Sequence, residues 1–104
     1  PYRAETPDQT LDLLSCGPLT FSAPDAEAFP CLRIARQCAE TGGTACAIMN
    51  GANEVAVARF LRGEIGFNDI PRRVEKALFR VPVKYQPSLG DILEADRMGR
   101  EAAR

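Results

Sequence analysis

The sequence predicts an all-α protein, a small helical bundle of about four helices preceded by an extended N-terminal arm. From residue 30 onward, apolar residues recur at the three-to-four-residue spacing of amphipathic helices, and glycines or prolines separate the segments. Residues 1–29 lack this spacing and hold four of the eight prolines. The 104 residues suit one small domain, so we divide the chain into an arm (1–29) and a bundle (30–104).

Residues 1–29 form the predicted arm. Proline makes a helix unfavourable here, yet the segment carries too many apolar residues for a solvated linker. These residues are Leu11, Leu13, Leu14, Leu19 and Phe21. We therefore expect an extended segment with strand character that lies against another surface.

The first helix is predicted to begin at Pro30, because a missing N–H costs nothing in the first helical turn. Its expected apolar face consists of Cys31, Leu32, Ala35, Cys38 and Ala39. The pair Gly42–Gly43 should end this helix, since glycine readily takes the left-handed conformation of a C-terminal cap.

The second helix is predicted to begin after Thr44, a suitable N-cap, and to end at Gly63. It is apolar nearly all round, which is typical of the central helix of a bundle. We expect it to break near Asn50–Gly51, because glycine disfavours a helix interior and asparagine favours caps.

The third helix should be capped by Asn68, with Asp69 in its first turn complementing the helix dipole. Its predicted apolar stripe is Ile70, Val74, Ala77, Leu78 and Val81.

A fourth helix is predicted after the loop that Pro82 and Pro87 bracket. Ser88 and Asp91 resemble a capping box, with aspartate in place of the usual glutamate. The short connections between the predicted helices favour antiparallel neighbours.

The charge pattern gives no sign of a nucleic-acid or membrane partner. The net charge is −1, and no apolar run approaches the roughly 20 residues that span a bilayer. The one basic cluster is Arg72, Arg73, Lys76, Arg80 and Lys84. Residues 52–80 resemble a helix-turn-helix in outline, but the would-be recognition helix presents an acid and two apolar groups to the groove. We therefore expect no nucleic-acid binding and no membrane binding.

The cysteines Cys16, Cys31, Cys38 and Cys46 form no CxxC pair, and the chain has no histidine. This argues against a zinc site. Their even number leaves a disulfide framework open. However, Cys31 and Cys38 lie seven residues apart on the predicted apolar face, where we expect reduced, buried thiols. That expectation indicates a reducing compartment.

No residue pattern for catalysis, cofactor binding or metal binding is found. The glycines of "GGT" follow a helix rather than a strand, and no serine has a histidine partner. The acids Asp91, Glu94 and Asp96 lie close in sequence, but Arg97 and Arg100 follow as surface partners. We therefore expect no catalytic residues in this chain: none that catalyse the reaction, none that bind a cofactor and none that bind a metal ion.

The stretch "IMNGANEVAV" places Asn50, Asn53 and Glu54 in an apolar run. An amide is neither a general base nor a nucleophile, and a single carboxylate is weak evidence for acid–base catalysis. We interpret the three residues as a structural polar hinge. Asn50 would satisfy N–H groups at a helix start, Glu54 would sit in the first turn, and Asn53 would bond to a neighbouring element.

Several segments, in one order, resemble the C-terminal part of 1-deoxy-D-xylulose 5-phosphate reductoisomerases. The segments are "LTF..PD...FPCL", "GGTA", "N.ANEVAV..FL", "I.F.DIP" and "ILEAD". The resemblance covers nearly the whole chain. One departure is Gly51, where the family usually has alanine, and we expect it to loosen the helix by about 1 kcal/mol.

The resemblance implies a parent enzyme several times longer than this chain. Such an enzyme converts 1-deoxy-D-xylulose 5-phosphate to 2-C-methyl-D-erythritol 4-phosphate in non-mevalonate isoprenoid biosynthesis, using NADPH and a divalent metal (Mg or Mn). An N-terminal Rossmann-type domain holds NADPH, and a central domain holds the metal and substrate and forms a homodimer. The resemblance implies a bacterial cytoplasmic location, or a plastid in a eukaryote.

The family's metal-binding and phosphate-binding residues lie upstream of Pro1, so the resemblance implies no cofactor site in this chain. It implies a structural C-terminal domain whose partners are the missing N-terminal and central domains, with the arm packed on the central domain. The alternative is a free-standing helical protein-interaction module.

Overall fold

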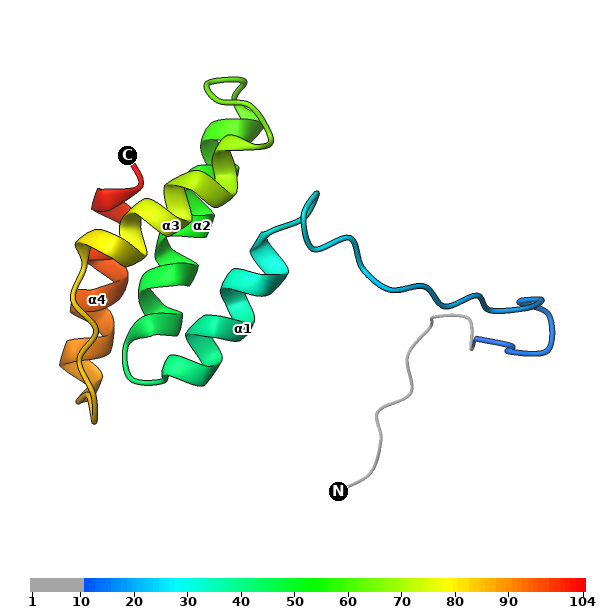
Figure 1. Cartoon of the computed structure of the whole chain (residues 1–104), viewed down its shortest axis with the longest axis horizontal. Coiled ribbons are helices and arrows are strands. Elements are labelled where there is room, and N and C mark those ends of the chain that lie inside the picture. Colours follow the sequence, from blue (N-terminus) through cyan, green and yellow to red (C-terminus); the bar gives the residue numbers. More distant parts are fainter. Residues whose placement is uncertain (1–10) are drawn as a thin grey trace.

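The computed structural model describes residues 11–104, which form four helices and no strand (Figure 1). Residues 1–10 of the predicted arm lie outside the described residues. The helices are α1 (Cys31–Thr41), α2 (Ala45–Leu61), α3 (Asp69–Arg80) and α4 (Leu89–Ala102). The predicted all-α bundle is confirmed.

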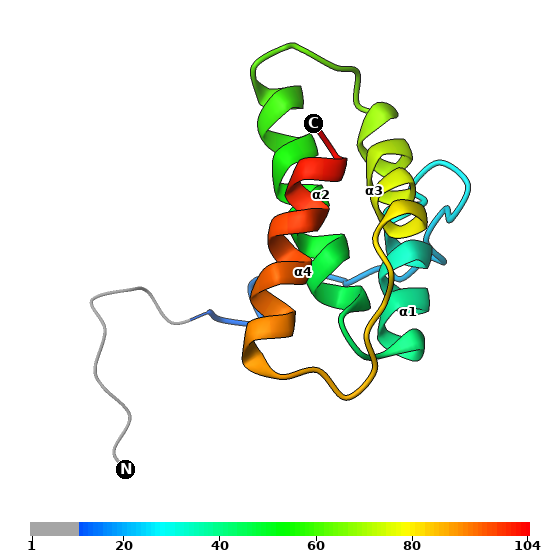
Figure 2. The same cartoon turned by 90° about the vertical axis from the view of Figure 1, so that its left-hand side faces the viewer.

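Helix α2 is the centre of the bundle and packs against the other three helices (Figure 2). Ile48, Ala52 and Ala56 on α2 are fully buried. Val74 and Ala77 of α3 are buried against the same core. Because so many core side chains are small, the helices lie close together and contacts between backbones become important.

The face that helix α1 buries matches the predicted one only in part, because Ile34 was not among the residues expected to be buried. Ile34 and Cys38, one turn apart, are buried, whereas Cys31 and Leu32 are exposed. The expected burial of Cys31 is therefore wrong. Only one side of α1 meets the rest of the bundle, so a pair at i and i+4 fills the contact. All four cysteines are free thiols.

Helix α2 runs without a break through Asn50–Gly51, so the expected break is wrong. Gly51 is buried where α2 meets α4, and a Cβ added there would lie 2.6 Å from the Asp96 carbonyl oxygen. Gly99 meets α2 in the same way, because its Cβ would lie 2.5 Å from the Ile48 carbonyl oxygen. The two glycines let the helices approach closely, and tertiary packing outweighs the weak helix propensity of glycine.

The predicted helix ends are confirmed in position, but only one predicted side-chain cap is formed. Thr44 and Asn68 occupy N-cap positions without capping hydrogen bonds from their side chains. Thr44 instead bonds to the backbone of Lys84: its Oγ1 accepts from the Lys84 N–H at 3.0 Å, and its own N–H donates to the Lys84 carbonyl at 3.1 Å. This clasp ties the α1–α2 connection to the α3–α4 connection.

The predicted capping box of α4 is confirmed. The Asp91 N–H donates to Ser88 Oγ at 3.2 Å, and the Ser88 N–H donates to the Asp91 carboxylate at 2.8 Å. Lys84 Nζ also donates to that carboxylate at 2.6 Å. Hydrogen bonds from Lys84 and then from Ser88 lower the pKa of Asp91 to about 2.

We expect the stability that Asp91 provides to be lost in acid. Its folded pKa lies below the unfolded value of about 3.9, so its contribution is complete above that value and disappears as the pH falls towards about 2. Thermal unfolding should therefore show a lower Tm for Asp91→Asn than for the parent chain at pH 6, and similar values at pH 2. A Tm difference that stayed constant across this range would contradict the assignment.

Residues 11–29 form the described part of the arm, which extends away from the bundle without helix or strand (Figure 1). Local turns at Asp12 and Asp25 bend it, and the Asp25 carboxylate accepts the Glu27 and Ala28 N–H groups at 3.0 and 2.9 Å. The expected strand character is absent from these residues, because a strand needs a neighbour to pair with. Apolar side chains stay exposed, with Leu14 at 96% and Phe21 at 92%.

Candidate functional site

The polar residues of "IMNGANEVAV" divide between two different surroundings along α2. In the first, Asn50 Nδ2 donates to Glu54 Oε1 at 3.2 Å. Arg100 Nη2 of α4 donates to Glu54 Oε2 at 2.7 Å, and Arg100 Nε donates to Asp96 Oδ2 at 2.7 Å. This cluster (Asn50, Glu54, Asp96 and Arg100) joins α2 to α4 beside the Gly51 contact.

The cluster is suited to holding two helices rather than to catalysis. The hydrogen bonds that Arg100 donates to Asp96 and Glu54 raise its pKa, so its guanidinium keeps its proton. A general acid or base needs a group that exchanges a proton near the working pH, and Arg100 does not. The side chain of Glu54 is 53% exposed, so solvent screens its ion pair with Arg100 and the pair contributes little stability.

Asn53 does not belong to this cluster and instead lines a hollow of about 190 Å³. We call this the arm-root hollow, because the last residues of the arm form one wall. Its walls include Phe29, Cys31, Val57, Phe67 and Pro71. The structure therefore does not gather Asn50, Asn53 and Glu54 into one site.

Asn53 makes no side-chain hydrogen bond with any part of the chain from residue 11 to residue 104. The expected bond from Asn53 to a neighbouring element is therefore not formed within these residues. Asn50 likewise lies inside a helix rather than at a helix start. Whether the three residues act structurally stays a prediction.

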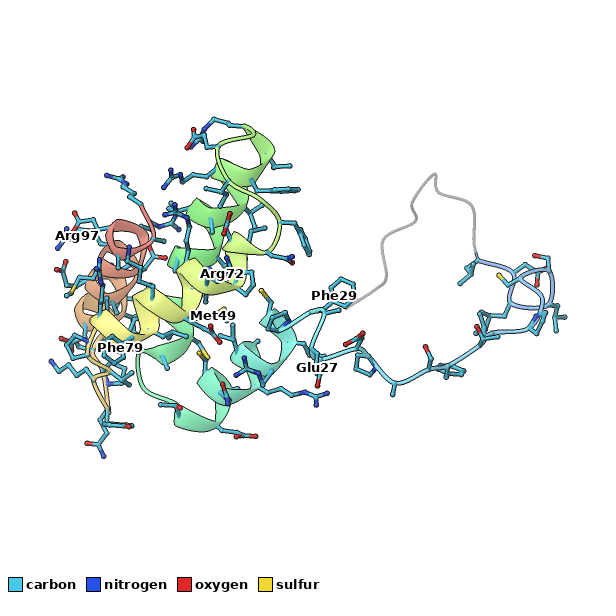
Figure 3. All side chains as sticks on the ribbon, turned by 45° about the horizontal axis from the view of Figure 1, so that its top comes forward. Glu27, Phe29, Met49, Arg72, Phe79 and Arg97 are labelled. Carbon is cyan, nitrogen blue, oxygen red and sulfur yellow. The ribbon has the colours of Figure 1, made fainter. Side chains whose placement is uncertain are left out.

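Phe67 contacts two other aromatic rings, and it lines the hollow together with Phe29. The Phe29 and Phe67 ring centroids lie 6.5 Å apart, and those of Phe60 and Phe67 lie 5.8 Å apart, both edge to face. Figure 3 shows Phe29 where the arm meets the bundle. Phe29 and Phe67 nevertheless remain 57% and 53% exposed.

The exposed thiol in the arm-root hollow is poorly suited to nucleophilic chemistry. Desolvation, with a smaller effect of the Glu75 carboxylate, raises the pKa of Cys31. The thiolate is the reactive form of cysteine, so a raised pKa leaves less of it at neutral pH.

The residues that the structure describes offer no set of ligands for a metal ion. Between residues 11 and 104, no group of three or more histidine, cysteine or acidic side chains is placed to hold one. Within the same residues, no helix has the length and apolar character needed to cross a membrane.

Two residues of the predicted basic cluster, Arg73 and Lys84, form hydrogen bonds within the bundle. Arg73 Nη1 donates to the carbonyls of Ala103 and Arg104 at 2.9 and 3.0 Å, where it satisfies the C-terminal end of α4. Lys84 pairs with Asp91, as described above. No local sequence pattern predicts the role of Arg73, because its partners lie about 30 residues away in the chain.

Comparison with known proteins gives a match over nearly the whole chain. The family described as DXP reductoisomerase C-terminal domain matches residues 1–102. The 1-deoxy-D-xylulose 5-phosphate reductoisomerase of Pseudomonas paraeruginosa is 50% identical over 99% of this chain, and that of Ruminiclostridium cellulolyticum is 45% identical over 100%. The chain spans only 26% and 27% of the lengths of these two relatives.

A solved structure has the same fold. The 1-deoxy-D-xylulose 5-phosphate reductoisomerase from Zymomonas mobilis in complex with NADPH is 43% identical to this chain, with a TM-score of 0.82. The similarity covers 98% of this chain and 27% of that one.

Proposed function

Because this chain belongs to the family of DXP reductoisomerase C-terminal domains, we propose that it is the helical support domain of a longer reductoisomerase. The observation that carries the proposal is the family match over residues 1–102 in a chain that spans 26% of its Pseudomonas relative. The remaining length would supply the N-terminal and central domains.

The proposed parent enzyme converts 1-deoxy-D-xylulose 5-phosphate to 2-C-methyl-D-erythritol 4-phosphate for isoprenoid biosynthesis. NADPH is the proposed reductant, supported by the NADPH bound to the Zymomonas relative. A divalent metal, Mg or Mn, is proposed for the parent, with its ligands outside this chain. The parent enzyme is proposed to be a homodimer that is located in the bacterial cytoplasm, or in a plastid in a eukaryote.

The proposed role of this chain is to support the fold without taking part in chemistry. Arg100 is held by two carboxylates, the Cys31 thiol is disfavoured as a nucleophile, and residues 11–104 offer no metal ligand set. Asn50, Asn53 and Glu54 are accordingly assigned structural roles. The arm would pack against the central domain through its exposed apolar side chains.

We expect the isolated chain to have no reductoisomerase activity. The 104-residue chain, supplied with 1-deoxy-D-xylulose 5-phosphate, NADPH and Mn²⁺, should leave NADPH unoxidised when absorbance is followed. A chimaera in which this chain replaces the matched part of the Pseudomonas enzyme should oxidise NADPH. The same enzyme with the matched part deleted is the control and should be inactive.

Two results would contradict the proposal. Substrate-dependent oxidation of NADPH by the isolated chain would place catalytic groups within it. A folded but inactive chimaera would show that the chain cannot serve as this domain. In the gene, a start codon directly before the codon of Pro1 would favour a free-standing interaction module instead.

A further inference from the structure

We propose that the arm-root hollow is a docking socket for an extended backbone segment that carries an apolar side chain. The segment comes from the part of the parent polypeptide outside this chain, so the inference rests on the proposed function. Docking at the hollow would give this domain a contact with the rest of the polypeptide, and Asn53 would take part in that contact.

The size of the hollow favours a side chain over a small-molecule ligand. Its volume of about 190 Å³ is below the roughly 300–1,000 Å³ of ordinary ligand pockets. Its walls are mainly apolar, with Val57, Phe67 and Pro71 among them. Burying an aliphatic or aromatic side chain against such walls would stabilise the docked state, because apolar surface leaves water.

Asn53 supplies the polar part of the recognition. Its amide carries two donor hydrogens and an accepting oxygen, and residues 11–104 provide no hydrogen-bond partner for them. An extended backbone offers one N–H and one C=O per residue, which match an asparagine side chain. A docking segment that covers the hollow would therefore satisfy Asn53, whereas a purely apolar occupant would leave its amide desolvated and unpaired, which is unfavourable.

The position of the hollow favours the parent polypeptide over a second copy. Phe29 is both the last aromatic residue of the arm and a wall of the hollow. Anything joined to the arm is held near the hollow at an effective concentration that reaches the millimolar range for short linkers. The arm is also apolar and uncovered, with Leu14 and Phe21 more than 90% exposed, so arm and hollow present neighbouring surfaces that need covering.

The thiols of Cys31 and Cys46 allow a direct test, because both are exposed and only Cys31 lines the hollow. Iodoacetamide labelling would be followed at each cysteine by fragment-ion mass spectrometry. It would be measured in the 104-residue chain and in the full-length polypeptide that contains it. In the full-length protein we expect labelling to slow by about tenfold or more at Cys31 and to change little at Cys46.

Matched variants of the full-length protein test the role of Asn53. Asn53→Ala should return the labelling rate of Cys31 towards that of the isolated chain. Asn50→Ala, which removes an amide that bonds to Glu54 and does not line the hollow, should leave Cys31 slow. Equal labelling of Cys31 in the two proteins would overturn the proposal, as would equal effects of the two variants.

Two further outcomes would identify a different occupant and also overturn the proposal. Slower labelling of Cys31 in the isolated chain as its concentration rises would indicate a second copy. Faster labelling of the isolated chain after deletion of residues 1–24 would indicate its own arm. NADPH oxidation measured on the same full-length sample separates the docking proposal from the proposed parent function. If the sample oxidises NADPH but its Cys31 is not protected from labelling, only the docking proposal is refuted. If Cys31 is protected but NADPH is not oxidised, the proposed parent function is refuted.

Discussion

Gly99→Leu is expected to lower the free energy of unfolding of this chain by about 3 kcal/mol. A side chain at this position meets backbone rather than flexible side chains. A Cβ would lie 2.5 Å from the carbonyl oxygen of Ile48 and 3.0 Å from its Cα. Helix α4 would have to move away from α2, and this movement would open the contact beside Gly51 as well.

Such a loss is large for a domain of this size. Small domains are stable by only about 5–15 kcal/mol, and this core relies on alanines and glycines packed at short range. Urea unfolding followed by circular dichroism at 222 nm would measure the change. The rest of α4 should remain a good helix, because leucine has a higher helix propensity than glycine.

The same substitution at Gly90 is the control. Gly90 lies in the first turn of α4, where an added Cβ would meet only Ser88 Oγ, at 3.7 Å. Gly90→Leu should therefore raise stability by roughly 0.5–1 kcal/mol through helix propensity. If the two variants shifted stability in the same direction, the close approach of α2 and α4 would not be the reason for Gly99.

Thr44→Val is expected to destabilise the chain by about 2 kcal/mol. Thr44 is only 1% exposed, and its Oγ1 accepts the Lys84 N–H at 3.0 Å. Valine fills nearly the same space but leaves that N–H without a partner. The loss should therefore reflect an unsatisfied donor rather than a cavity.

Thr41→Val tests this interpretation. Thr41 is exposed, and its hydroxyl donates to the carbonyl of Gln37 in the same helix at 2.8 Å. Water can replace that bond, so the change in unfolding free energy should stay within about 0.5 kcal/mol. Hydrogen exchange offers a second measure, since the Lys84 amide should lose protection in Thr44→Val only. Unchanged protection of Lys84 would contradict the proposed clasp.

The helix ends are features that the local sequence was sufficient to predict. Gly42 and Gly63 both adopt positive φ values, 72° each, just after α1 and α2, where their sequence positions predict helix ends. The capping box of Ser88 and Asp91 forms between residues three apart. These features depend on neighbours in the chain, and a sequence displays those directly.

The surroundings of the candidate site residues are features that the local sequence was insufficient to predict. Asn50, Asn53 and Glu54 lie within five positions, yet Asn53 faces a hollow while Glu54 pairs with Arg100 on another helix. The expected break at Asn50–Gly51 was wrong because propensity alone gives no information about what packs against a glycine. Partners that lie 40 or more residues apart appear only when the helices are assembled.

The sequence by itself determined the number and approximate limits of the helices, the extended apolar arm and the family. The reason is that periodicity, caps and motifs are properties of neighbouring residues. The tertiary structure alone decided which cysteine is buried, why glycine stands at positions 51 and 99, and that Thr44 clasps Lys84 instead of capping α2. Those outcomes depend on how closely two helices approach, and that distance is set by all the side chains between them.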